Sequence, residues 1–106
     1  MGTVVRRANG QAITDIDRVS NGVLWEEKSA TGLFGEGGDW IAKHIVGKFG
    51  NYMEARTMLP GYTDAPIGFS FTQAATPEFQ SAVESAIAGL RTANPGVRIL
   101  TQWAQQ

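Results

Sequence analysis

The chain of 106 residues contains no cysteine and one histidine. Without cysteine it can form neither disulfides nor the cysteine-based zinc sites of nucleobase deaminases. A single histidine, His44, also excludes metal cages built from several histidines. There is no apolar run long enough to span a bilayer and no charged, apolar leader, so we expect no membrane contact. The formal net charge of −1 is low for a protein that binds nucleic acid.

Two Asn-Gly pairs predict tight turns near the start of the chain. Asn-Gly is the strongest short hairpin signal because both turn positions need positive φ, which these residues tolerate. The pair at residues 9–10 would connect a strand at 3–8 to a strand at 11–19. The pair at 21–22 would connect that second strand to a third at 23–28. The sequence therefore predicts an N-terminal three-stranded antiparallel meander.

The rest of the chain predicts an alternation of helices and strands. A glycine-rich stretch at 30–38 is typical of a flexible flap. Apolar residues at helical spacing predict a helix at 39–59, and alternating apolar residues predict a strand at 67–72. A Thr-Pro-Glu start and an Asn-Pro-Gly stop delimit a second helix at 77–93, followed by a strand at 97–103. We expect an α/β fold in which helices flank a mixed sheet with parallel, right-handed crossovers.

The second turn also predicts which charged side chains meet. Continued along the strands, its pairing sets Asp17 opposite Glu26 and Asp15 opposite Lys28. Side chains alternate across a strand, so all four would project from one face of the hairpin. Facing carboxylates repel each other unless a cation or a proton lies between them. A positive group is therefore expected between Asp17 and Glu26.

The first turn adds a basic residue to the same face. Its pairing sets Val4 opposite Asp15 and Arg6 opposite Ile13. Arg6 would then lie beside the acidic residues, whereas Arg7 would point to the other face.

An acidic residue on one arm of a hairpin, Glu-x-Lys on the other arm and a helix after it resemble the PD-(D/E)XK phosphodiesterase superfamily, which has the restriction-endonuclease fold. Glu26-Glu27-Lys28 matches the Glu-x-Lys element, and Asp15 or Asp17 matches the preceding acid. The family's acid usually lies across the hairpin from the glutamate, so cross-strand pairing favours Asp17 over Asp15. The residue before Asp15 is threonine, where the family name would suggest proline.

The resemblance implies a metal-dependent endonuclease. Asp17 and Glu26 would hold Mg²⁺ or Mn²⁺, ions that prefer hard carboxylate oxygens. Asp15 would add a direct or water-mediated ligand. Lys28 would orient the attacking water and stabilise developing negative charge. The predicted catalytic residues are therefore Asp15, Asp17, Glu26 and Lys28.

Basic residues outside this set are candidates for binding the substrate. His44 and Lys48 lie one turn apart on the same side of the first predicted helix, where His44 could protonate a leaving group or contact a phosphate. The simpler interpretation is a boundary histidine on a solvated basic helix face. The predicted substrate-binding residues are Arg6, Lys43, His44 and Lys48.

The size of the chain suits one domain, residues 1–106. It also resembles the C-terminal toxin domains of contact-dependent growth inhibition and other polymorphic bacterial toxin systems. That resemblance implies a nuclease that is secreted on a larger carrier, acts in the cytoplasm of a target bacterium and is neutralised by an immunity protein. Among nucleic acids we favour RNA, and tRNA in particular, over DNA, because a compact domain without a duplex-wrapping arm suits a small folded substrate.

Two other functions stay open from the sequence. In a non-enzymatic protein-interaction module, the charges would form an exposed surface ladder with Lys28 paired to Asp15, and binding would use a sheet edge or exposed tryptophans. A metal-independent ribonuclease would use His44 with a glutamate. The three functions differ in their dependence on divalent metal ions.

Overall fold

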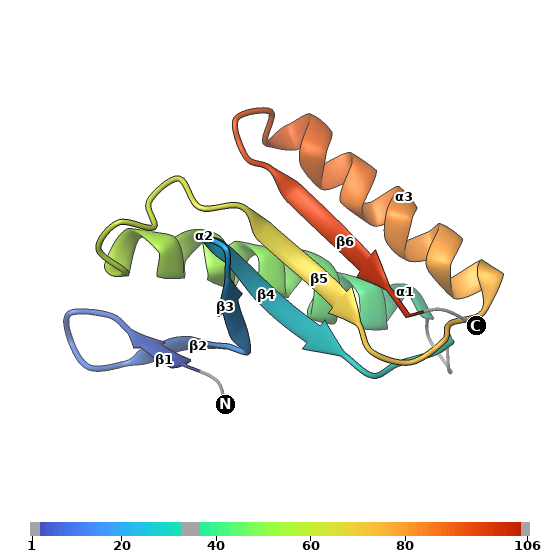
Figure 1. Cartoon of the computed structure of the whole chain (residues 1–106), viewed down its shortest axis with the longest axis horizontal. Coiled ribbons are helices and arrows are strands. Elements are labelled where there is room, and N and C mark those ends of the chain that lie inside the picture. Colours follow the sequence, from blue (N-terminus) through green and yellow to red (C-terminus); the bar gives the residue numbers. More distant parts are fainter. Residues whose placement is uncertain (1–2, 33–36, 105–106) are drawn as a thin grey trace.

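Two hairpins open the chain, and each belongs to a different sheet (Figure 1). The computed structural model describes residues 3–32 and 37–104; residues 33–36, in the predicted flap, lie outside this part of the chain. The α/β class predicted from the sequence is confirmed. In chain order the elements are β1 (Thr3–Arg6), β2 (Ala12–Ile16), β3 (Arg18–Ser20), β4 (Val23–Lys28), α1 (Gly37–Ile41), the π-helical segment η1 (Ala42–Gly47), α2 (Lys48–Met58), β5 (Ile67–Phe71), α3 (Pro77–Ala93) and β6 (Ile99–Trp103).

The predicted three-stranded meander is wrong, because the chain bends between β2 and β3. β1 and β2 form a sheet of their own, whereas β3 joins β4 in a four-stranded sheet of order β3-β4-β5-β6. Asp17 lies at the bend. Its N–H donates to the hydroxyl of Tyr52 at 3.4 Å, and its Oδ2 accepts from the N–H of Glu27 at 2.8 Å. These contacts hold Asp17 at the bend, outside the strand ladder.

The second Asn-Gly turn forms as predicted. Asn21 and Gly22 have φ values of 52° and 78°, the left-handed conformation that a tight hairpin turn requires. Arg18 pairs with Trp25, in the predicted register.

The first Asn-Gly turn differs from its prediction. Only Gly10 of that pair has positive φ, and its N–H donates to the carbonyl of Arg7 at 2.8 Å, so the turn begins earlier in the chain. A β-bulge in the following ladder makes Arg6 pair with Ala12 and not with Ile13. A bulge places two residues of one strand opposite one residue of the other, which moves the register by one position.

The helices begin and end close to the predicted positions. α1, η1 and α2 follow one another without a break, where one helix at 39–59 was predicted. α3 begins after Thr76, whose hydroxyl accepts the N–H of Phe79 at 3.2 Å as an N-cap. None of the helices in the described ranges has the length and hydropathy needed to cross a membrane.

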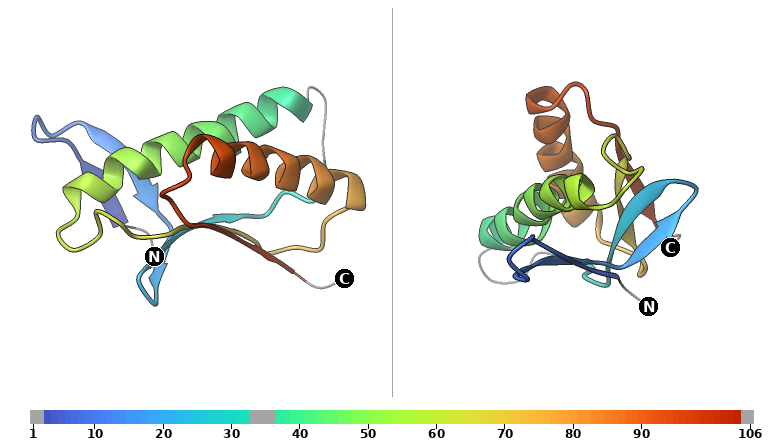
Figure 2. Two further views of the ribbon diagram at one scale, coloured as in Figure 1. Left: turned by 90° about the horizontal axis from the view of Figure 1, so that it is seen from above. Right: turned by 90° about the vertical axis from the view of Figure 1, so that its left-hand side faces the viewer.

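Both helical segments lie on the same face of the four-stranded sheet (Figure 2). The sheet is mixed, as predicted: β3 and β4 are antiparallel, while β4, β5 and β6 are parallel. Right-handed crossovers that add each new parallel strand on the same side put all connecting helices on one face. The opposite face carries Trp25, whose ring covers Gly68 and lies under the guanidinium of Arg18 at 5.1 Å from the ring centroid.

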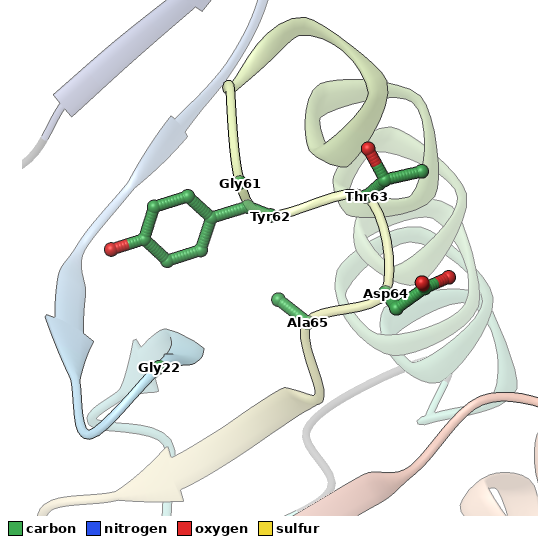
Figure 3. Close-up of a pocket in the computed structure, with 6 residues that line it drawn as sticks. All are labelled: Gly22, Gly61, Tyr62, Thr63, Asp64 and Ala65. Carbon is green, nitrogen blue, oxygen red and sulfur yellow. The ribbon is translucent and has the colours of Figure 1, made fainter.

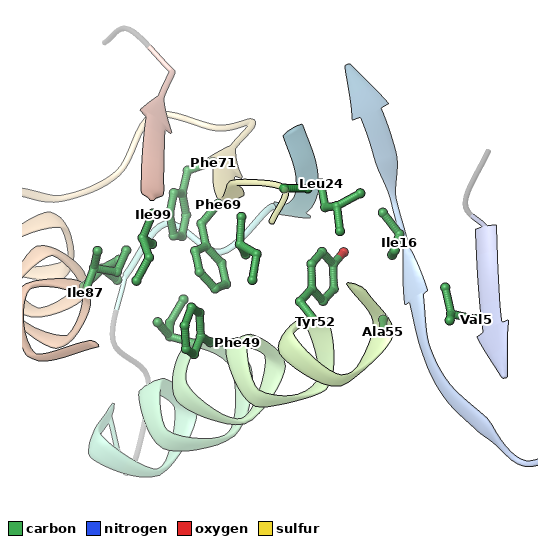
Figure 4. Close-up of a cluster of buried hydrophobic side chains, with 14 of the residues drawn as sticks. Val5, Ile16, Leu24, Phe49, Tyr52, Ala55, Phe69, Phe71, Ile87 and Ile99 are labelled. Atoms are coloured by element: carbon green, nitrogen blue, oxygen red, sulfur yellow. The ribbon is translucent and has the colours of Figure 1, made fainter. Parts of the chain in front are cut away.

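The core lies between the helices and both sheets. In Figure 4 the ring of Tyr52, from α2, lies near Leu24 of β4 and Ile16 of β2. All three residues have less than 2 % of their surface exposed. The β1–β2 hairpin packs against the side of α2, so β2, β4 and α2 meet around the Tyr52 side chain.

Candidate active site

Glu26 is a carboxylate placed inside the protein by the alternation of β4. Leu24 and Glu26 point toward the helices and are buried, whereas the Glu27 side chain between Glu26 and Lys28 is exposed. Glu26 is only 4 % exposed. Burying a charged group is unfavourable unless it has a charged or hydrogen-bonding partner.

Both oxygens of this carboxylate have partners. Oε2 lies 2.7 Å from Nζ of Lys28, in an ion pair whose side chains are 6 % and 11 % exposed. Oε1 accepts the hydroxyl of Tyr52 at 2.8 Å. Glu26 and Lys28 therefore form a buried, hydrogen-bonded ion pair and not the exposed charge ladder of the alternative hypothesis.

Tyr52 was not identified from the sequence, where it belongs to the apolar stripe of a helix. Burial, followed by the charge of Glu26, raises the pKa of the Tyr52 hydroxyl well above its ordinary value, so the group stays protonated and acts as a donor. The signal that could have identified it is its hydroxyl. A buried tyrosine needs a hydrogen-bonding partner that a phenylalanine in the same stripe does not need.

Asp17 joins the site from the bend. Its carboxylate accepts the N–H of Glu27, so it reaches β4 immediately beside Glu26. The structure thus brings Asp17 next to Glu26, as predicted, but through a side-chain contact at the bend and not through the predicted strand pairing.

Asp15 is not part of this group. It lies in β2, pairs with Val4 as predicted, and is exposed. The predicted pairing of Asp15 with Lys28 is wrong, because the bend at Asp17 ends the ladder before it reaches Asp15. Only the backbone carbonyl of Asp15 approaches the site, 3.2 Å from the Tyr52 hydroxyl.

Arg6 is also outside the group, and its predicted place beside the acids is wrong. Its Nη1 donates to the carbonyl of Gly10 at 3.0 Å, in an exposed contact within the first hairpin. The shifted register of that hairpin is the cause. Arg7 contacts the helices, because it makes two hydrogen bonds of 2.5 and 2.8 Å to the carboxylate of Glu54.

The helix that follows β4 carries three basic residues, Lys43, His44 and Lys48, which we call the basic edge. Lys48 donates to the hydroxyl of Thr14 in β2 at 3.2 Å, and His44 lies one turn earlier. Burial lowers the pKa of His44, and the charges of Lys28, Lys43 and Lys48 lower it further. These three lysines are therefore close enough to act electrostatically on one imidazole.

His44 lies in the π-helical segment η1 and packs against Trp40, with ring centroids 4.9 Å apart. Short π-helical segments are rare and occur frequently at functional sites. Of the predicted substrate-binding residues, Lys43, His44 and Lys48 thus lie on the continuous helix η1–α2, and the charges of both Glu26 and Lys28 act on His44.

The carboxylates present at this site decide whether a divalent ion fits. Among residues 3–32 and 37–104, no three His, Cys, Asp or Glu side chains form a group that could hold a metal. Asp17 and Glu26 provide two carboxylates, and Mg²⁺ is commonly held by one or two carboxylates while it keeps several waters. The donor chemistry therefore fits Mg²⁺ or Mn²⁺, provided that an oxygen of Glu26 is released from Lys28.

A depression of about 460 Å³ lies away from this site (Figure 3). It lies at the β3–β4 turn and the loop after α2, at the end of β4 opposite Lys28. Asp64 is the carboxylate in its lining. The residues that line it are Gly22, Gly61, Tyr62, Thr63, Asp64 and Ala65.

Comparison of the chain with protein-family models, with curated proteins and with solved structures finds no match. The functional interpretation therefore depends on the residues of the site and their geometry.

Proposed function

We propose that this protein is a metal-dependent nuclease with a restriction-endonuclease-like arrangement of its catalytic residues. The observation that carries the proposal is the buried pair of Glu26 and Lys28, 2.7 Å apart, with the Asp17 carboxylate bound to the next backbone N–H. An acidic residue followed by Glu-x-Lys on a strand is the set of residue types, in the chain order, that the resemblance to the PD-(D/E)XK superfamily implies for a nuclease.

The residues of the site support a division of roles. Asp17 and Glu26 would hold Mg²⁺ or Mn²⁺, which supplies positive charge to the phosphate and to the water that attacks it. The ammonium group of Lys28 lies 2.7 Å from Oε2 of Glu26. Once an oxygen of Glu26 is released, this ammonium orients the water and stabilises negative charge on the phosphate.

The basic edge supports a nucleic-acid substrate despite the low net charge. Lys43 and Lys48 have no acidic partner among the described residues, so their charge is available to a phosphate backbone. His44, whose lowered pKa favours the neutral imidazole, can accept a hydrogen bond or a proton at neutral pH. RNA, in particular tRNA, is the proposed substrate, ahead of DNA.

The biological setting is part of the same proposal. The domain would be a bacterial toxin that is carried out of the producing cell on a larger protein. It would act in the cytoplasm of a target bacterium, and a dedicated immunity protein would neutralise it in the producer.

The direct experiment incubates the purified protein with total RNA and with plasmid DNA, each with Mg²⁺ and with EDTA. We expect cleavage that needs the metal and disappears in Glu26→Gln and in Lys28→Ala. Glu27→Gln is the matched control, because Glu27 is the neighbouring carboxylate on the other face of β4. Full activity of both site variants, or no cleavage by the native chain, would remove the proposal.

The competing proposal is a protein-interaction module. Trp25 favours it, because side chains alternate along β4, so its ring lies on the face opposite Leu24 and Glu26, with the guanidinium of Arg18 over it. The two proposals differ in the response to Mn²⁺, since an ion that binds the folded state raises the melting temperature. Stabilisation that is lost in Glu26→Gln supports the nuclease, and indifference to the ion supports the module.

A further inference from the structure

The hydroxyl of Tyr52 joins three separate parts of the candidate active site. Tyr52 is 0 % exposed, and its hydroxyl lies 2.8 Å from Oε1 of Glu26 on β4. The N–H of Asp17, at the bend, lies 3.4 Å from the same oxygen. The carbonyl oxygens of Asp15 and Trp25 lie at 3.2 and 3.1 Å.

The proton of this hydroxyl can satisfy one acceptor well, and Glu26 is the strongest. A hydroxyl has one proton to donate and two lone pairs that accept. Hydrogen bonds to a charged acceptor are shorter and stronger than those to a carbonyl, and the Glu26 contact is the shortest of the set. The hydroxyl oxygen remains free to accept the N–H of Asp17. One side-chain group thus connects the carboxylate of Glu26 to the backbone that carries Asp17.

The hydrogen bond from Tyr52 fixes the orientation of the Glu26 carboxylate. With Oε1 held by Tyr52 inside the protein, Oε2 is the oxygen directed at Lys28. Packing alone does not require the hydroxyl, since phenylalanine has the same ring and would fill the same space.

We infer that Tyr52 is a positioning residue of the nuclease: its hydroxyl holds Glu26 and the bend at Asp17 in the relative position that lets both carboxylates bind one divalent ion. The inference rests on the proposed function and adds to it a residue from the helix that follows the Glu-x-Lys strand.

The test compares Tyr52→Phe with Tyr62→Phe. The hydroxyl of Tyr62 makes no hydrogen bond to the described residues, so its removal controls for the loss of a tyrosine hydroxyl. The first readout is the Mn²⁺ concentration at half-maximal thermal stabilisation. Partners that orient metal ligands typically change metal affinity or activity by about 10- to 100-fold, and we expect a rise of this size in Tyr52→Phe. We expect kcat to fall by a similar factor, while KM for the nucleic acid changes by less than about twofold.

A second measurement leaves the hydroxyl of Tyr52 in place. The chain has two tyrosines, so labelling with 3-fluorotyrosine gives two fluorine resonances. Mg²⁺ should shift the resonance of Tyr52, leave that of Tyr62 in place, and shift neither in Glu26→Gln.

The outcomes separate this inference from the proposed function. A Tyr52→Phe protein that matches the native chain in Mn²⁺ response and kcat, while Glu26→Gln loses both, overturns the role of Tyr52 and leaves the nuclease intact. A Tyr52 resonance unmoved by saturating Mg²⁺ overturns it as well. A native chain with no response to metal and no cleavage overturns both proposals.

Discussion

Replacement of Lys28 by methionine should reveal how deeply the charge of Glu26 is buried. Methionine keeps an unbranched apolar side chain but removes the ammonium group that lies 2.7 Å from Oε2 of Glu26. The Tyr52 hydroxyl at 2.8 Å would be the remaining partner of the carboxylate. Breaking a buried ion pair from one side costs about 3–5 kcal/mol. Because one strong hydrogen bond remains, we expect a loss near the lower end, about 3 kcal/mol.

The assay is urea and thermal unfolding of the native and variant chains. For a domain of this size, a loss of this magnitude lowers the melting temperature by on the order of 15 °C. The double variant Glu26→Gln/Lys28→Met should recover most of the lost stability, since neutral replacement of a whole buried pair is often tolerated.

The matched control is Glu27→Gln, on the same strand but on the open face. Glu27 pairs with Arg18 at 3.2 Å, and these side chains are 41 % and 38 % exposed. A pair this exposed contributes about 0–1 kcal/mol. If Lys28→Met were no more destabilising than Glu27→Gln, the Glu26–Lys28 pair would behave as a solvated surface pair, and the reasoning from burial would be refuted.

Three further predictions concern other parts of the chain. The single histidine gives one imidazole signal in a proton NMR titration, and its midpoint should lie below 6.5, because burial first and Lys28 next lower the pKa of His44; Lys48→Met should raise it. As the pH falls, the imidazole becomes protonated in the unfolded chain at a higher pH than in the folded chain. The contribution of His44 to stability is therefore full above about pH 6.5 and decreases as the pH falls toward the folded pKa. The variant His44→Gln should flatten this part of the curve of stability against pH. Gly68→Ala should lower the free energy of unfolding by about 1–3 kcal/mol, because the added Cβ would lie 2.9 Å from Cδ2 of Trp25 and even closer to other ring carbons. The control is Gly50→Ala, which should not destabilise the chain, because an added Cβ at Gly50 has no neighbouring atom within 4 Å. Thr76→Ala removes the N-cap of α3 and should cost about 1 kcal/mol, measured by urea unfolding.

Local signals predicted the elements that depend on local conformation. Asn21-Gly22 forms the expected turn, and Thr76 is the N-cap of the helix predicted at 77–93. The same dipeptide failed at residues 9–10, where the turn starts at Arg7 and a bulge moves Arg6 away from its expected partner. Two turn geometries are compatible with that sequence, and the pairing of the flanking strands decides between them.

The errors in the candidate site arise from contacts between residues far apart in the sequence. The meander fails because Asp17 bonds to Tyr52, which lies 35 residues further along the chain. That bend removes Asp15 from the face it was expected to share with Glu26. It also retains Asp17 beside β4, so the predicted grouping of Asp17, Glu26 and Lys28 survives although the ladder that was used to derive it does not.

The buried pair at the centre of the site is difficult to explain by stability alone. A domain of 106 residues has a small core, and a buried ion pair generally stabilises a fold no better than apolar side chains of the same volume. Here Glu26 lies at the junction of β2, β4 and α2, through its contact with Tyr52, and Lys28 is its charged partner. The double variant Glu26→Gln/Lys28→Met therefore separates two explanations. If that protein is as stable as the native chain but no longer cleaves nucleic acid, chemistry accounts for the two charges; if it loses its fold, the pair specifies how the bend and the hairpin meet.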